Sequence, residues 1–162
     1  KYGTDATRYI LLRHVHPTED SDVTWDRLDE WYTANLTNGL GNLVARVMKL
    51  AETHLEQPVV RPDMSPFPQE YWDMLSAFEF NHAMDLVWER IQALDSRITT
   101  EEPFKLVKED NEKGRALIEG LVVELYQIGR LLNPFMPKTN KLIKKAVLDN
   151  KKPENLFPRL AK

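Results

Sequence analysis

Cysteine is absent from this chain of 162 residues. Its absence excludes disulfide bonds, thiolate nucleophiles and Cys-ligated zinc. Histidine is scarce, and the close pair in "HVH" is typical of a solvated turn rather than of a metal site. The four histidines are His14, His16, His54 and His82. We therefore expect neither a metal nor a cofactor to be bound by this chain.

Long apolar runs are also missing. No segment reaches the roughly 20 apolar residues of a transmembrane helix, and no signal peptide opens the chain. We expect a soluble, cytoplasmic protein without a membrane partner. The length suits one compact domain, and the lack of an initiator Met leads us to expect a piece of a longer protein.

Catalytic signatures are missing as well. No nucleophile stands beside a base, and no carboxylate pair stands out from the acidic residues of solvated helix faces. The stretch "GLGNLV" lacks the Lys and the Ser or Thr of a phosphate-binding loop, and it lacks the spacing of a dinucleotide-binding turn. We expect no catalytic residue in this stretch of chain.

The net charge is −3, which argues mildly against nucleic-acid binding through bulk electrostatics, but the charge is uneven. From Lys138 to Lys162 there are eight Lys or Arg residues and two acidic residues, a net +6, so the rest carries −9. Such a run is typical of a solvated helix face. A contact with nucleic-acid phosphates is the alternative.

Apolar residues recur at threes and fours along most of the chain, which is the period of an α-helix. Proline-rich or turn-forming stretches separate the helical segments. We predict a turn at 17–22 and a loop at 56–68. The two predicted helix breaks are "EEPF" at 101–104 and "NPFMP" at 133–137. The predicted helices are 4–13, one beginning after Asp22 or Thr24 and reaching 55, one from 69 to the break at Pro103, 110–132 and 138–148. The fold class is an all-α antiparallel helix bundle.

Two of these helices carry long apolar stripes that are expected to face the core. The third helix has no proline before Pro103, so it is predicted to be continuous and about 50 Å long. The stripe of the second helix is Trp25, Leu28, Tyr32, Leu36, Leu40, Leu43, Val47 and Leu50. The stripe of the third helix is Tyr71, Met74, Leu75, Phe78, Val87, Ile91, Leu94 and Ile98.

The second helix also carries a polar stripe, and Gly39 lies between this stripe and the apolar one, which is expected to leave the adjacent backbone open; Gly41 follows two residues later. The stripe holds amide and cationic side chains without an acidic residue, and its members are Asn35, Asn38, Asn42, Arg46 and Lys49. A polar surface face is the simplest interpretation. Each glycine costs about 1 kcal/mol relative to alanine in a helix, a cost that is tolerated where something must come close to the backbone.

The chain resembles a known family. Five blocks carry the resemblance in order: "YGTDATRYILLR", "NLTNGLGNLVARV", "FEFNHAMDLVWERIQALDSRITTEEPFKL", "LLNPFMPKT" and "LFPRL". They are similar to the anticodon-binding region of methionyl-tRNA synthetases, from residue 2 to about residue 160. The first two blocks are shared with class I synthetases for leucine, isoleucine and valine, whereas the third block and the spacing of the last two are more specific to methionine.

This resemblance implies a fragment of a larger ligase, which joins methionine to its tRNA using ATP and Mg²⁺. The ATP-binding signatures of the "HIGH" and "KMSKS" types do not occur here, so they are expected in an upstream catalytic domain of the same chain. Residues 1–20 are similar to the end of the link from that domain, and residues 21–162 to the anticodon-binding bundle. The implied partner is the anticodon loop of tRNA(Met).

The resemblance also implies a binding site for the CAU anticodon. The positions that match the family's anticodon readers are Asn42, Arg46 and Phe104. Asn and Arg four residues apart on a helix can reach one unstacked base, and an aromatic ring provides a stacking surface. The family usually has Trp where this chain has Phe104, and a core plug behind Pro103 is the alternative role for the ring. "ALDSRI" replaces a more usual Asn and Tyr before this break, which puts contacts there in doubt.

Two other functions stay open at this point. One is the equivalent domain of a synthetase for leucine, isoleucine or valine. The other, from a different class, is a helical protein-interaction module that uses the same bundle.

Overall fold

The computed structural model describes residues 1–15, 19–59 and 66–160. Within these ranges the chain is helical and contains no strand, as predicted. No helix among them is both long enough and apolar enough to cross a membrane. The elements are α1 (Thr4–His14), α2 (Trp25–Trp31), the π-helical segment η1 (Tyr32–Gly41), α3 (Asn42–His54), α4 (Gln69–Ser76), α5 (Phe80–Glu101), α6 (Pro103–Glu109), α7 (Asn111–Leu132) and α8 (Pro137–Leu148).

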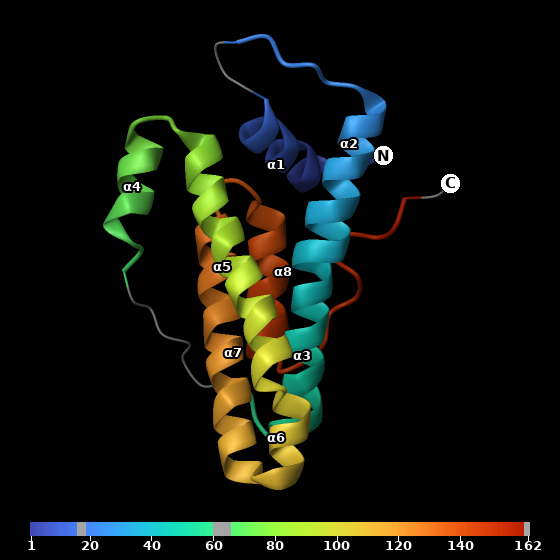
Figure 1. The fold of residues 1–162 in the computed structure, drawn as a ribbon, viewed down its shortest axis with the longest axis vertical. Coiled ribbons are helices and arrows are strands. Elements are labelled where there is room, and N and C mark those ends of the chain that lie inside the picture. Colours follow the sequence, from blue (N-terminus) through green and yellow to red (C-terminus); the bar gives the residue numbers. More distant parts are fainter. Residues whose placement is uncertain (16–18, 60–65, 161–162) are drawn as a thin grey trace.

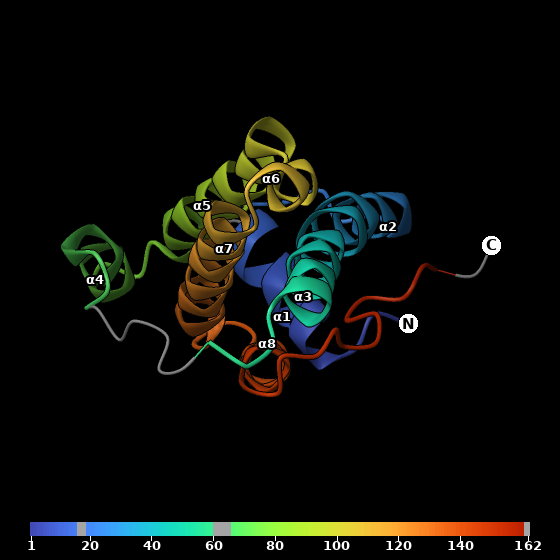
Figure 2. The ribbon, with the colours of Figure 1, turned by 90° about the horizontal axis from the view of Figure 1, so that it is seen from below.

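The bundle is organised around α7, which runs antiparallel to α3, α5 and α8 and packs on all three (Figure 1). Seen from below, these helices surround a common core, while α4 lies outside on the α5 side (Figure 2). The short helix α6 turns back along α7 at the lower end. Gly114 of α7 allows this approach, because a Cβ there would lie 2.5 Å from Val107 of α6.

The amino-terminal helix α1 lies across the upper end and is tied to the end of the bundle near α8. Asp5 is buried and accepts hydrogen bonds from the backbone N–H and the hydroxyl of Thr139, at 2.7 and 2.9 Å. Arg8 donates to the carbonyls of Pro134 and Phe135 at 2.8 and 2.7 Å. The stretch "NPFMP", predicted to end the fourth helix, therefore also anchors α1.

The third predicted helix is wrong in one respect, because it is broken into α4 and α5. Phe78 adopts a left-handed φ of 61°, and two backbone bonds close the end of α4: Phe78 N–H to the Leu75 carbonyl and Glu79 N–H to the Met74 carbonyl. This is the hydrogen-bond pattern of a helix stop that usually carries glycine. Phenylalanine at that position gives no such signal in the sequence.

Two apolar residues assigned to the core stripes are exposed instead. Trp25 is in the first turn of α2, before the helix reaches the bundle, and Phe78 projects from the α4–α5 turn. The other members of both stripes are buried or partly buried against the core. The sequence also missed α6, whereas the remaining helices match the predicted spans to within a few residues. The predicted turn at 17–22 and loop at 56–68 lie partly outside the described residues.

Candidate nucleic-acid interface

A groove of about 640 Å³ opens between α3, α5 and the start of α6. Three of the residues that line it are those predicted from the sequence: Asn42, Arg46 and Phe104. They come from segments about sixty residues apart, yet they face the same space. The full lining is Asn38, Asn42, Ala45, Arg46, Lys49, Leu50, Thr53, His54, Asp95, Ile98, Phe104 and Lys152.

The wall that carries Asn42 begins directly after the π-helical segment. Thr24 caps this long helix by accepting from the Arg27 N–H, and the chain then stays helical through α2, η1 and α3 without a break. The segment η1 contains both glycines. A π-helix widens the turn and shifts the residues after it around the helix axis, and such segments are frequent at functional sites.

Gly41 is the glycine that the backbone geometry requires. A Cβ on Gly41 would lie 2.9 Å from the Leu36 carbonyl oxygen and 3.6 Å from the ring of Phe157. The chain's own carboxyl-terminal segment therefore approaches the backbone at this point, and the Tyr32 hydroxyl fixes it by donating to the Pro158 carbonyl at 2.9 Å. At Gly39 a Cβ would be 3.4 Å from the Ala34 carbonyl, which is an ordinary contact.

The polar stripe of the sequence follows the groove for most of its length. Asn38, Asn42, Arg46 and Lys49 are all exposed and line it, while Leu43 and Val47 of the same helix are buried in the core. Asn35 is partly buried and is not part of the lining. The helix thus presents amide and cationic donors on one edge and packs through the other.

Phe104 is held at the opposite wall by the break between α5 and α6. Glu102 takes a left-handed φ of 43°, and Pro103 is buried at the first position of α6, where its missing N–H costs nothing. Phe104 is 45% exposed, so the core-plug role is wrong. The ammonium of Lys105 lies 6.0 Å from the ring centroid.

The sequence did not identify Asp95, which pairs with Arg46 inside the groove. Asp95 belongs to the "ALDSRI" stretch that departs from the family, and its Oδ1 accepts from Arg46 Nη1. Both side chains remain accessible, at 43% for Arg46 and 47% for Asp95. An exposed ion pair of this kind contributes at most about 1 kcal/mol to stability. This small gain does not explain why an arginine and an aspartate occupy these two positions.

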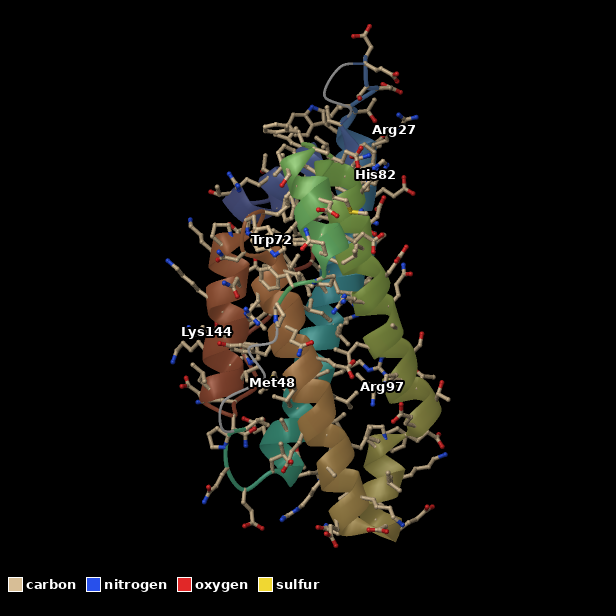
Figure 3. The ribbon with its side chains drawn as sticks, turned by 90° about the vertical axis from the view of Figure 1, so that its left-hand side faces the viewer. Arg27, Met48, Trp72, His82, Arg97 and Lys144 are labelled. Atoms are coloured by element: carbon tan, nitrogen blue, oxygen red, sulfur yellow. The ribbon has the colours of Figure 1, made fainter. Side chains whose placement is uncertain are left out.

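The basic tail divides into two parts. The lysines of α8 lie across the bundle from α6, as Figure 2 shows for the helix and Figure 3 for Lys144, which points outward. Lys152 belongs to the segment after α8 and lines the groove together with Lys49. Among the described residues of the predicted basic run, Lys152 is thus the one lysine placed at the groove lining.

A second hollow, of about 610 Å³, lies between α4 and α5. Its ionisable lining includes Glu70, Asp85 and Glu89 against Arg90 and His82. Three carboxylates repel phosphate, so this hollow is the weaker candidate for nucleic acid. The described residues also contain no cluster of three or more His, Asp or Glu side chains that would hold a metal ion.

Comparison with known proteins points to one group of enzymes. The family model described as class I tRNA synthetases (M) matches residues 1–48. A methionine–tRNA ligase of Caldanaerobacter subterraneus is 28% identical over 155 residues, covering 87% of this chain and 24% of that protein. The ligase of Helicobacter pylori is 30% identical over 151 residues, which is 86% of this chain and 23% of the ligase. The chain therefore spans about a quarter of the length of these relatives.

The fold agrees with solved structures of the same kind. The free form of Mycobacterium tuberculosis methionyl-tRNA synthetase matches 99% of this chain and 40% of its own, with a TM-score of 0.80 at 20% identity. A complex of that enzyme with methionyl-adenylate matches 86% of this chain and 31% of its own, with a TM-score of 0.67 at 22% identity. At these identities the structural match supports the fold, and the sequence relatives support the homology.

Proposed function

We propose that this chain, a homologue of methionyl-tRNA synthetases over most of its length, is the part of such an enzyme that reads the CAU anticodon of tRNA(Met). One observation carries the proposal: Asn42, Arg46 and Phe104 line the same exposed groove. These are the residue types that an unstacked base requires, namely hydrogen-bond donors for its edge and a ring for its face.

The chemistry fits a cytosine splayed out of a loop. Its N3 and O2 accept hydrogen bonds, and the guanidinium of Arg46 and the amide of Asn42 both offer donors. The accessible ring of Phe104 stacks on the base from the other wall. Lys49 and Lys152 lie in the lining and neutralise phosphates that flank the base.

The whole enzyme attaches methionine to tRNA(Met) using ATP and Mg²⁺ in the cytoplasm, and its chemistry takes place in an upstream catalytic domain. We assign residues 1–20 to the end of the link from that domain and residues 21–162 to the anticodon-binding bundle. The hydrogen bonds from α1 to the α7–α8 turn support a rigid junction, because Asp5 and Arg8 fix the link to the bundle.

Substitutions in the groove test this function. Asn42→Ala and Arg46→Ala are each expected to weaken binding of a CAU anticodon stem-loop by roughly 1 to 3 kcal/mol, measured by fluorescence anisotropy at low ionic strength. Arg27→Ala is the matched control. Arg27 is 50% exposed, pairs with Asp22, and lies at the far upper end of the bundle (Figure 3).

If the chain is instead a protein-interaction module, the opposite results are expected. Neither groove substitution then changes RNA binding, and the protein partner stays bound after ribonuclease treatment. Equal losses with Arg27→Ala would also contradict the proposal, since they would indicate a general charge effect.

A further inference from the structure

We propose that Asp95 is a specificity-determining residue that accepts a hydrogen bond from the exocyclic amino group of the first anticodon base. This inference rests on the proposed function and assigns a role to the ion pair in the groove. An acidic side chain is unexpected beside the phosphates of RNA, because it repels them. Its place in the lining of the same groove as Arg46 and Phe104 therefore needs a reason.

The geometry leaves hydrogen-bonding capacity on both partners. Their bond uses Arg46 Nη1 and Asp95 Oδ1. Among the described residues, Arg46 Nε and Nη2 and Asp95 Oδ2 have no other hydrogen bond. The pair thus offers one free acceptor next to free donors, held together by their own contact.

This set of groups is complementary to cytosine. The base presents a donor at N4 and acceptors at N3 and O2, so Asp95 accepts from N4 while Arg46 donates to N3 and O2. A guanine offers cytosine the same combination in a base pair. The ion pair imitates that edge with two side chains from α3 and α5.

Uracil is rejected by the same arrangement. Its O4 is an acceptor, and it would face the carboxylate of Asp95, which has only acceptors to offer. Arg46 and Asn42 do not distinguish the two bases at O2, which both bases carry, whereas a donor at N3 favours cytosine because N3 of uracil carries a hydrogen. Recognition of the amino group at N4, as opposed to O4 of uracil, therefore falls to Asp95.

A purely positioning role is the competing interpretation, in which Asp95 does no more than orient Arg46. That role acts through the donors of Arg46 at N3 and O2 and does not involve the amino group at N4. Loss of Asp95 would then weaken binding of cytosine and of a base that lacks the amino group by the same factor, whereas a direct contact changes the ratio of their affinities.

The test compares CAU and UAU stem-loops on the 162-residue chain and on Asp95→Asn. The asparagine amide can donate to O4 of uracil, so we expect the CAU/UAU affinity ratio to fall by at least about fivefold. Asp85→Asn is the matched control on the same helix, because Asp85 is 53% exposed and also pairs with an arginine, Arg13. Its ratio is expected to equal that of the unmodified chain.

A modified RNA isolates the single bond. Replacing the first base with pyrimidin-2-one removes the amino group, which should weaken binding to the unmodified chain at least about threefold more than binding to Asp95→Ala. An unchanged ratio in Asp95→Asn, with Asn42→Ala and Arg46→Ala still harmful, overturns this inference and leaves the proposed function intact. Equal binding of both RNAs by the unmodified chain overturns the two together.

Discussion

Phe104 shows how backbone conformation at one position decides what a side chain can do. The left-handed Glu102 and the buried Pro103 turn the chain so that the next ring faces the groove. The sequence predicted the break from proline and the ring from its family position. It could not decide between a core plug and an exposed platform, because that depends on how α6 folds back on α7.

Stacking at Phe104 predicts a graded series. Phe104→Ala is expected to weaken binding of the CAU stem-loop by about 1 to 3 kcal/mol, because a base loses its aromatic partner. Phe104→Trp is expected to bind at least as tightly as the unmodified chain, since the indole enlarges the stacking face. Affinity measurements check the series, and thermal unfolding provides the control. If Phe104→Ala lowered the unfolding temperature but not the affinity, the ring would be structural.

His14 is a second residue whose surroundings change its chemistry. Its ring stacks on Trp31 at 4.5 Å between centroids and lies 3.2 Å from the Tyr9 hydroxyl. Burial, reinforced by the nearby positive charge of Arg13, lowers the pKa of His14 to about 4, although the carboxylate of Asp85 acts in the opposite direction. The folded state therefore resists protonation of this ring more than the unfolded chain does.

Protonation of His14 makes the stability of the fold depend on pH. The unfolded chain binds the proton below about pH 6.5 and the folded chain only below about pH 4, so stability is lost as the pH falls through this window. Replacing His14 with Phe keeps an aromatic ring against Trp31 and removes the titration. Between pH 7 and pH 4.5 the unmodified chain should lose roughly 1 to 3 kcal/mol more stability than His14→Phe in urea unfolding. Parallel curves would contradict this account.

At the scale of elements, the helices were predictable and their irregularities were not. The period of apolar residues predicted the helical spans. Thr24, one of the two predicted starts of the second helix, caps α2 by accepting from a backbone N–H. Asp110 caps α7 in the same way, which was not predicted from the sequence. The end of α4 at Phe78 and the π-helical register of η1 left no trace in that period. Both depend on local backbone conformations that residue type alone does not specify.

The π-helical segment makes a matched pair of glycine substitutions informative. Gly41→Ala places a Cβ 2.9 Å from a backbone carbonyl, so we expect a loss of about 1 to 3 kcal/mol in unfolding free energy and weaker RNA binding as Asn42 shifts. Gly39→Ala meets its nearest atom at 3.4 Å and is expected to be neutral or slightly stabilising. Chemical denaturation of both variants checks the prediction. Equal effects at the two positions would show that Gly41 is not constrained.

At the scale of the whole molecule, the five sequence blocks that resemble one family meet in space. The first block contacts "NPFMP" through Arg8, which lies 127 residues before Phe135. The second lies beside the closing "LFPRL", because a Cβ on Gly41 would be 3.6 Å from the ring of Phe157. It also faces "EEPF" across the groove. The apolar period identifies the buried face of each helix, but it does not indicate which helices pack together. These contacts could therefore not be predicted from the sequence pattern.

The basic side chains are divided between α8 and the groove. The lysines of α8 lie away from the groove, and the lysines in its lining are Lys49 and Lys152. A chain of net charge −3 is therefore expected to bind RNA through a local site rather than a broad basic surface. Discrimination between bases, rather than total affinity, is the more direct indicator of its function.

Whether the groove reads the first anticodon base is decided by the affinities of the 162-residue chain for CAU and UAU anticodon stem-loops at the same low ionic strength. The two RNAs differ at one base and carry the same charge, so phosphate contacts cancel in the comparison. We expect the UAU stem-loop to bind at least about fivefold more weakly than the CAU stem-loop. A difference below about twofold would contradict the assignment of the groove as a reader of the first anticodon base.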